Sequence, residues 1–264
     1  MDSDQAGQED TVSCDTLFAG RLHCLQHRFG YRFSVDAILA AHFSPPQSGA
    51  KVLDLGCGCG VIALICLYRW QQQIASVSCL ELQPGLASLA SRNMALNGYA
   101  DKMEVVEGDL RHILDFFPAE SFVQVICNPP FYKKNSGRPC LDRESFIARH
   151  QVHCSLIEVV GAAAAVLKNR GKAVFVYPAA GLNALFSALQ QYHLVPKRLQ
   201  TIYSYPDGAA AARLVLVEAV KNGGEGLQIL APFYIYERRQ GAYSRQMQRL
   251  YDLDWISAEE SLSV

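Results

Sequence analysis

Apolar and polar positions follow two rhythms along this chain of 264 residues. Short apolar runs predict buried strands at 51–55, 76–81, 103–107, 122–127 and 173–177. Longer segments predict helices at 61–72, 84–97, 155–168 and 181–191, with a short helix near 111–117. A further helix is expected over 33–43, where Ser34 is a suitable N-cap. This alternation is typical of a mostly parallel sheet that helices cover on both faces.

The pattern changes after residue 191. Two predicted strands at 198–205 and 212–220 flank a Pro-Asp-Gly turn, which favours an antiparallel hairpin, and another strand is predicted at 227–236. We therefore expect an α/β fold with a doubly wound, mostly parallel sheet and a C-terminal antiparallel hairpin. A single domain over 16–251 is expected between a disordered acidic tail at 1–15 and a second acidic tail at 252–264.

A glycine-rich loop follows the first predicted strand of this sheet. Asp54 opens it, and Gly56, Gly58 and Gly60 occupy alternate positions after that acid. Glycines let the backbone turn tightly and approach a ligand, and ligands of this fold class bind at the carboxyl ends of the strands. The spacing differs from the G-x-G-x-x-G of dinucleotide enzymes, and an acid suits a ligand ammonium better than a pyrophosphate. A plain strand-to-helix turn is the alternative.

Acids also follow the next two predicted strands. Glu81 ends the second strand, where its carboxylate could accept hydrogen bonds from both hydroxyls of a ribose. Asp109 follows the third strand, where it could accept a hydrogen bond from an adenine amine. Each acid is weak evidence alone, but three acids at three successive strand ends indicate a nucleoside ligand with a charged amino-acid tail.

The fourth strand is followed by Asn128, Pro129, Pro130 and Phe131. The two prolines hold the backbone extended, so the Asn128 side chain and the Pro129 carbonyl become fixed acceptors. These acceptors can bind the two N–H groups of a planar amine and aim its lone pair, while Phe131 stacks on the target. A rigid loop with an apolar anchor is the structural alternative.

These motifs together resemble S-adenosylmethionine-dependent methyltransferases of class I, whose fold is Rossmann-like. Residues 28–251 are most similar to the bacterial valine-tRNA (adenine-N6)-methyltransferase family. That resemblance is carried by segments 32–36, 128–132, 147–150, 230–236 and 241–243. It implies that Arg32, Ser34 and Asp36 line the cofactor site, to which Asn128 also belongs. It further implies methyl transfer from S-adenosyl-L-methionine to the N6 of a flipped adenine next to the anticodon of valine tRNA.

The charge distribution changes how the net charge of −1 is interpreted. Residues 1–15 hold five acids and residues 252–264 hold four, with no lysine or arginine in either segment, so the body carries a net charge of +8. Basic clusters with interleaved aromatic residues occur at 131–149 and 237–249. These clusters fit tRNA phosphates, although an ordinary solvated surface is the alternative.

Composition places the protein in the cytoplasm. No apolar stretch is long enough to span a membrane, and the acidic first residues are unlike a secretion signal. The nine cysteines are scattered and are expected to be reduced. Cys57 and Cys59 have no partner ligands at metal-binding spacing, so they are expected to fill small positions of the glycine loop, and no metal site is predicted.

Three other functions remain open at this stage. A guanine-N2 rRNA methyltransferase and a glutamine-N5 methyltransferase acting on release factors use a similar Asn-Pro-Pro motif. The glutamine enzymes usually carry a helical domain before the glycine loop, and only about 50 residues precede it here. An RNA-binding module without catalytic activity is the third alternative, against which the complete motif and glycine loop argue.

Overall fold

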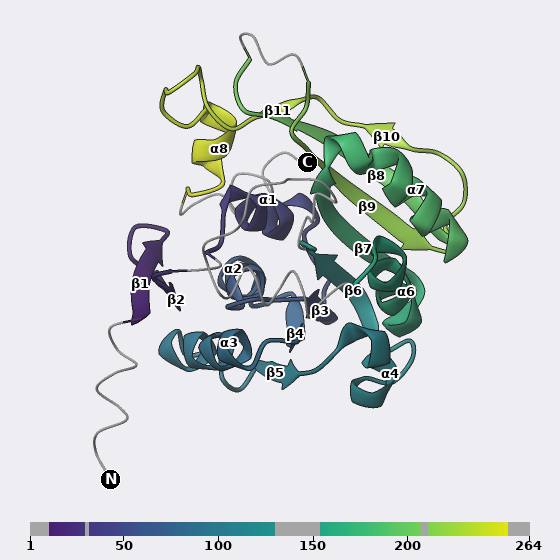
Figure 1. The fold of residues 1–264 in the computed structure, drawn as a ribbon, viewed down its shortest axis with the longest axis horizontal. Helices are drawn as coiled ribbons and strands as arrows, with labels where there is room; N and C mark the ends of the chain where they lie inside the picture. Colours follow the sequence, from purple (N-terminus) through teal and green to yellow (C-terminus); the bar gives the residue numbers. More distant parts are fainter. Residues whose placement is uncertain (1–10, 30–31, 130–153, 207–210, 253–264) are drawn as a thin grey trace.

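A computed structural model describes residues 11–29, 32–129, 154–206 and 211–252. Within these ranges the chain forms a central sheet with the strand order β10-β8-β9-β7-β6-β3-β4-β5, and β11 also pairs with β8 (Figure 1). The strands are β3 (Ala50–Leu55), β4 (Ile74–Glu81), β5 (Met103–Glu107), β6 (Phe122–Cys127), β7 (Leu167–Pro178), β8 (Leu194–Tyr203), β9 (Leu214–Lys221), β10 (Gln228–Ile229) and β11 (Phe233–Tyr234). Strands β3 to β7 are mutually parallel, whereas β9 runs antiparallel to both β7 and β8. The expected doubly wound sheet and its C-terminal hairpin are therefore confirmed.

Helices cover both faces of the sheet (Figure 1). They are α1 (Val35–Phe43), α2 (Val61–Trp70), α3 (Pro84–Leu96), α4 (Ile113–Phe116), α6 (Leu156–Val166), α7 (Leu182–Gln191) and α8 (Arg245–Arg249), with short 3₁₀ turns η2 (Leu110–His112) and η3 (Ala179–Gly181). Residues of α1, α2 and α3 belong to one hydrophobic cluster, and residues of α4, α6 and α7 belong to the other. Strand β3 contributes to both, because Val52 faces the first cluster and Leu53 and Leu55 face the second.

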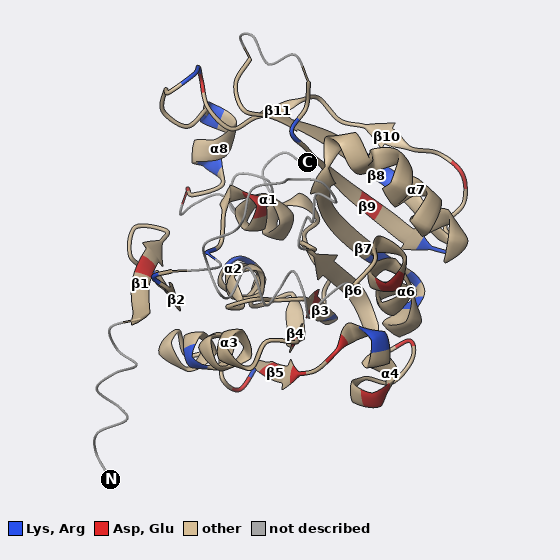
Figure 2. Ribbon diagram, in the orientation of Figure 1, with Lys and Arg blue, Asp and Glu red and all other residues tan. Residues whose placement is uncertain are grey.

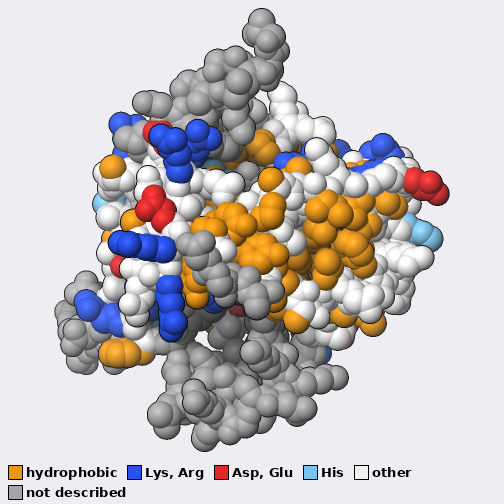
Figure 3. Space-filling view, turned by 90° about the horizontal axis from the view of Figure 1, so that it is seen from above, with side chains coloured by type: hydrophobic (Ala, Val, Ile, Leu, Met, Phe, Trp, Pro, Cys, Tyr) orange, Lys and Arg blue, Asp and Glu red, His pale blue; other side chains and the backbone are white. Residues whose placement is uncertain are grey.

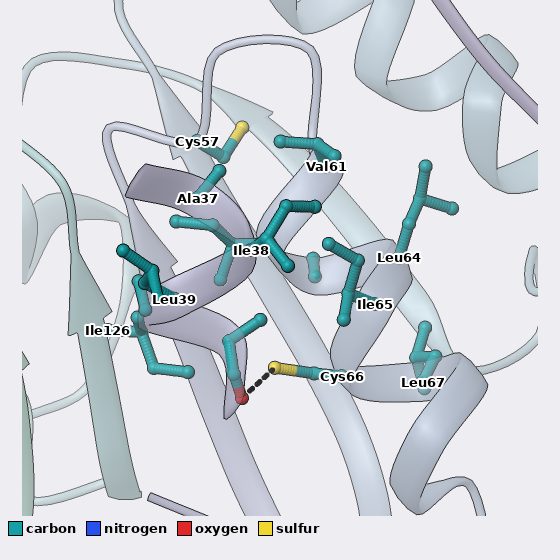
Figure 4. Packing of buried hydrophobic residues seen from close by; sticks show 14 of the residues in the cluster. Ala37, Ile38, Leu39, Cys57, Val61, Leu64, Ile65, Cys66, Leu67 and Ile126 are labelled. Carbon is teal, nitrogen blue, oxygen red and sulfur yellow. Dashed lines mark hydrogen bonds between the residues drawn. The ribbon is translucent and has the colours of Figure 1, made fainter. Parts of the chain in front are cut away.

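Within the first cluster, α1 packs against α2. Ser34 caps α1 as predicted, since its side chain accepts a hydrogen bond from the Asp36 amide. Figure 4 shows side chains from both helices, among them Ile38 and Ile65, meeting in this cluster, where the Cys66 thiol donates to the Ala41 carbonyl. The packing of α1 against α2 therefore fixes the helix that follows the glycine loop.

Two predicted boundaries are corrected by the structure. The helix expected over 155–168 ends at Val166, because Leu167 already pairs with Phe122 of β6. The register then shifts, so residues 168–171, including Arg170 with a φ of +65°, bulge out of β7 before Lys172 pairs with Gln124. The strand expected over 227–236 divides into β10 and β11, which both pair with β8. Pro232 lies between them and cannot donate a backbone hydrogen bond, so it interrupts the ladder.

The predicted tail boundary is also wrong, because residues 12–15 are not part of a disordered tail. They belong to β1 (Val12–Leu17), which pairs antiparallel with β2 (Leu22–His27). Asp15 pairs with Arg32, and Leu22 and Cys24 are buried against the domain, so this hairpin is held by charge and by apolar contact. Residues 1–10 and 253–264 of the expected tails lie outside the described residues.

Candidate active site

Four predicted site residues meet along the carboxyl edge of the sheet. Leu55 of β3 is in register with Leu80 of β4 on one side and with Cys127 of β6 on the other. Glu81 of β4 is in register with Glu107 of β5. The parallel pairing therefore brings the ends of four strands together, and Asp54, Glu81, Asp109 and Asn128 all lie at or just beyond those ends.

The glycine loop, residues 56–60, needs glycine at each alternate position. Gly56, Gly58 and Gly60 have φ angles of +74°, +57° and +80°, which side chains rarely tolerate. The Gly56 amide donates to the Leu80 carbonyl at 2.8 Å. A Cβ at Gly60 would lie 2.8 Å from the Met94 Cε. The loop is thus turned sharply and bound closely to both β4 and α3.

Asp54 is a buried acid with one unused acceptor. Its Oδ2 accepts a hydrogen bond from the Ala63 amide at 3.2 Å, at the start of α2. Its Oδ1 is buried and has no hydrogen-bond partner in the described structure. Burial raises the pKa of Asp54 to about 7. An oxygen that is buried without a partner at a strand end is suited to a cationic ligand group.

Glu81 holds the glycine loop from the neighbouring strand. Its Oε2 accepts from the Gly58 amide and its Oε1 accepts from the Gln83 amide, both at 2.9 Å. Burial raises the pKa of Glu81, and these hydrogen bonds oppose that shift. Each carboxylate oxygen keeps a second lone pair, so the group can still accept from a ligand hydroxyl.

Asp109 has a partner that the sequence analysis did not identify. It caps η2 through a 2.9 Å hydrogen bond from the Arg111 amide, and its carboxylate forms an ion pair with the Arg111 guanidinium. Hydrogen bonding from Arg111 lowers the pKa of Asp109. Asp109 is therefore a charged acceptor at neutral pH, and Arg111 competes with any ligand for it. The spacing of two residues was the available signal for this pair.

Asn128 and Pro129 directly follow β6, beside the end of β3. Pro129 is buried and Asn128 is partly buried. The other two residues of the motif, Pro130 and Phe131, lie outside the described residues. The predicted basic cluster at 131–149 also lies outside them. The structure thus brings the first half of the Asn-Pro-Pro-Phe motif to the carboxyl edge.

The segment before α1 lies close to the N-terminal hairpin. Arg32 forms an ion pair with Asp15 at 2.6 Å and donates to the His27 carbonyl at 3.0 Å. Ser34 caps α1, and Asp36 in its first turn has a buried Oδ1 without a hydrogen-bond partner in the described structure. Arg32 therefore already has partners within the chain, whereas Asp36 keeps a free acceptor.

The two loop cysteines are structural in character. Cys57 and Cys59 are both buried, and the adjacent Cys79 thiol together with burial raises the pKa of Cys57. The Cys59 sulfur lies 3.8 Å from the Cys24 sulfur of β2. Over the residues that the structure describes, no group of three or more His, Cys, Asp or Glu side chains could hold a metal ion.

Exposed arginines gather in the C-terminal segment, residues 236–249. Its start lies at the carboxyl edge, because β11 pairs with Ile202 and Tyr203 at the end of β8. Tyr236 and Tyr243 stack with ring centroids 5.4 Å apart. The exposed basic residues of the segment are Arg238, Arg239, Arg245 and Arg249. Figure 2 shows these charges at and beside α8, and Figure 3 shows basic side chains beside a broad hydrophobic area.

Comparison with known proteins agrees with this geometry. A family model described as the methyltransferase small domain matches residues 34–191, which contain the glycine loop and all the strand-end acids. The chain belongs to this methyltransferase family. The match also includes Asn128 and Pro129, so the family assignment covers both halves of the candidate site. None of the helices in the described ranges is long and apolar enough to cross a membrane.

Several relatives of this methyltransferase carry one name, tRNA1(Val) (adenine(37)-N6)-methyltransferase. The protein of that name from Shewanella loihica is 24% identical over 235 residues, covering 86% of this chain and 91% of the relative. The protein from Bacteroides thetaiotaomicron is 26% identical over 193 residues, covering 73% and 78%. The protein from Vibrio campbellii is 32% identical over 167 residues, covering 62% and 67%.

Solved structures share the fold of this methyltransferase. A predicted O-methyltransferase from Agrobacterium tumefaciens gives a TM-score of 0.66 at 21% identity, covering 82% of this chain and 95% of that chain. TrmN from Thermus thermophilus gives a TM-score of 0.52 at 18% identity, covering 70% and 48%. These likenesses establish the architecture and leave the substrate to chemical argument.

Proposed function

We propose that this methyltransferase uses S-adenosyl-L-methionine to methylate the N6 of an adenine in tRNA, the adenine next to the anticodon of valine tRNA. One observation carries the proposal. The buried, unpartnered Oδ1 of Asp54 lies on β3, and Asn128 follows the adjacent strand β6. Asp54 and Asn128 could therefore bind a cationic ligand group and an acceptor amine, respectively, from the ends of two adjacent strands. The names of the relatives support tRNA adenine as the acceptor.

The residues present fit S-adenosyl-L-methionine. Asp54 offers a buried acceptor for the amino-acid ammonium, and Glu81 offers a fixed carboxylate for the ribose hydroxyls. The glycine loop keeps side chains away from the backbone that the ligand would approach. Asp109 would accept from the adenine amine, and Ser34, Asp36 and Arg32 are proposed to line the same site. When bound, the cofactor supplies an electrophilic methyl group on a sulfonium.

Asn128 and Pro129 would prepare the acceptor amine. The lone pair of an exocyclic amine is delocalised into its ring, which makes the nitrogen a poor nucleophile. Hydrogen bonds from its two N–H groups to the Asn128 side-chain oxygen and the Pro129 carbonyl would favour a pyramidal nitrogen and aim its lone pair. Stacking on Phe131 and the rigidity of Pro130 would complete the positioning. Positioning is the main catalytic contribution in such a transfer, which needs no metal ion or covalent intermediate.

The C-terminal segment would bind the tRNA backbone. Its four exposed arginines can neutralise phosphates. The Tyr243 ring is already stacked with the rings of both Tyr236 and Tyr251, so the arginines carry this part of the proposal. The target adenine must leave its stack to reach Asn128, so a flipped base is part of the proposal. The enzyme would act in the cytoplasm, where tRNA is modified.

The test is nucleoside analysis by mass spectrometry. Valine tRNA transcribed in vitro is incubated with the protein and S-adenosyl-L-methionine carrying a labelled methyl group. Label in N6-methyladenosine next to the anticodon is the expected result, and a tRNA with guanine at that position should stay unlabelled. In parallel incubations that replace the tRNA with rRNA or with a release factor, label in N2-methylguanosine or in a glutamine, with none in the tRNA, would overturn the substrate. Cofactor binding without transfer to any RNA would support a binding module instead.

A further inference from the structure

Asn93 of α3 and Asn97, the C-cap of the same helix, bind the backbone of β2. The Asn97 side chain accepts from the His23 amide at 2.9 Å and donates to the His23 carbonyl at 2.7 Å. The Asn93 side chain does the same at Leu25, with distances of 2.6 Å and 2.9 Å. Four residues of helix and two residues of strand both rise by about 6–7 Å, so the amides match the backbone groups of the strand. Both side chains hold the hairpin in the same way.

Only one of the two reaches the glycine loop in the described structure. The Asn93 Nδ2 also donates to the Cys59 carbonyl at 2.9 Å. Asn93 is completely buried, and this bond lies beside the contact between the Cys59 and Cys24 sulfurs. Asn97, four residues later at the C-cap of α3, has its hydrogen bonds with His23 and with the Asn93 carbonyl. Asn93 therefore joins the hairpin, α3 and the loop through a single amide.

The loop needs such a restraint. Three glycines in five residues allow the unbound backbone many conformations. This conformational freedom is lost when a ligand binds, which weakens binding. Glu81 restrains the loop at the Gly58 amide, and Leu80 restrains it at the Gly56 amide. Neither of these bonds holds the Cys59–Gly60 peptide, where the loop turns into α2; the amide of that peptide donates to the Cys57 carbonyl at 2.9 Å, a bond within the loop itself. Asn93 holds that peptide by its carbonyl.

We propose that Asn93 is a positioning residue for cofactor binding, acting through the Cys59 carbonyl. The proposal rests on the proposed function, in which the glycine loop binds S-adenosyl-L-methionine. Asn93 does not need to contact the cofactor. It holds the loop in its binding conformation before the ligand arrives, and the N-terminal hairpin shares that restraint because Leu25 uses the same amide.

The experiment compares Asn93→Ala with its matched control Asn97→Ala in the full chain. Both variants lose a side-chain amide that pairs with β2, so thermal unfolding should show a lowered Tm in both. The dissociation constant of S-adenosylhomocysteine, measured by calorimetry, should rise about tenfold in Asn93→Ala and stay within about twofold in Asn97→Ala. The KM for S-adenosyl-L-methionine should rise similarly in Asn93→Ala, while kcat at saturating cofactor stays within about threefold.

Other outcomes would contradict the positioning role of Asn93 or the proposed function. Equal affinity in Asn93→Ala and the wild type, or equal losses in both variants, would overturn the positioning role. If Asn93→Ala does not fold, Asn93→Asp takes its place, because a carboxylate still accepts from Leu25 but cannot make both donations. Wild-type affinity in Asn93→Asp would also overturn it. A wild-type protein that binds no S-adenosylhomocysteine would instead overturn the proposed function, and this inference with it.

Discussion

The glycine-loop region and the C-terminal segment would recognise their proposed ligands by different physics. Around the glycine loop, the polar groups of Asp54 and Glu81 are buried and held by backbone amides. In the C-terminal segment, Arg238, Arg239 and Arg245 are exposed to solvent. A buried, preformed site selects its ligand by fit and desolvation, whereas exposed cations act over longer distances and are screened by salt. If the proposed function is right, changes of single atoms should affect cofactor binding most, and changes of total charge should affect RNA binding most.

Two acids on the cofactor side repeat this contrast on a smaller scale. Burial raises the pKa of Asp54 to about 7, whereas the Arg111 guanidinium holds the pKa of Asp109 below its usual range. A cationic ligand could therefore provide the charged partner that the Asp54 carboxylate needs, whereas Asp109 already has Arg111 as its charged partner. Cofactor binding should depend on pH through Asp54 and be insensitive to the titration of Asp109 at neutral pH.

The largest effect is expected at Asn128, where the substrate amine would be held next to the cofactor. Asn128→Ala removes the proposed acceptor of the substrate amine, so kcat should fall about 10²–10³-fold or more. Cofactor affinity should stay within about twofold, because Asp54 and Glu81 are untouched. Single-turnover methylation of tRNA and calorimetry with S-adenosylhomocysteine measure the two quantities. A loss of cofactor affinity equal to the loss of kcat would place Asn128 on the cofactor side only.

Asp54→Asn should give the next largest effect, because it removes the charge that a ligand ammonium would meet. The dissociation constant of the cofactor should rise about tenfold or more at pH 8. In the wild type, affinity should weaken as the pH falls below about 7, where Asp54 becomes protonated. In the variant the corresponding slope should be absent. Calorimetry at pH 6 and pH 8 checks this, and equal wild-type affinities at both would contradict it.

The same substitution should stabilise the protein without its ligand. A folded-state pKa raised to about 7 means that the folded protein binds this proton more tightly than the unfolded chain does. The resulting stability is present at low pH and is lost as the pH rises through about 7. Asp54→Asn should therefore raise the Tm at pH 8 more than at pH 5. If Asp54→Asn is less stable than the wild type at pH 8, the buried carboxylate must have stabilising partners that the substitution removes.

A smaller and salt-dependent effect is expected on the RNA side. Arg238→Ala combined with Arg239→Ala should weaken tRNA binding about five- to tenfold at low salt and reduce the slope of log K against log salt by about 1–2. Lys168→Ala with Arg170→Ala is the matched control, because these exposed residues begin β7 at the opposite edge of the sheet. Filter binding over a salt series gives both slopes. Equal losses in the two double variants would indicate binding through net charge alone.

Local patterns were sufficient to predict where most strands and their strand-end residues lie. Apolar runs define the strands. The place of an acid or a glycine relative to a strand end then follows from the local sequence alone. The ranges 103–107 and 122–127 agree with β5 and β6 residue for residue. Parallel pairing then brought Asp54, Glu81 and Asn128 to one edge, as the fold class required.

Contacts between distant segments could not be predicted in this way. The hairpin at 12–27 pairs with itself and is anchored by Asn93 and Asn97, about 70 residues later in the chain. No local pattern distinguishes a helix asparagine that binds a strand from one that faces water. The ion pair between Arg111 and Asp109 is local, and its spacing of two residues was a signal in the sequence, but whether it forms depends on how η2 turns. Arg32 was assigned from a family resemblance, and its partners in the hairpin were invisible in the sequence.

Arg32 therefore gives the smallest expected effect and the sharpest test of that assignment. Its guanidinium binds Asp15 and the His27 carbonyl, so Arg32→Ala should lower the Tm by about 2–4 °C and leave cofactor affinity within about threefold. Asp15→Asn breaks the same ion pair from the other side and should have a similar Tm. If Arg32→Ala weakens cofactor binding tenfold and Asp15→Asn does not, Arg32 contacts the cofactor. Arg32 would then belong to the cofactor site and not only to the contacts that hold the hairpin.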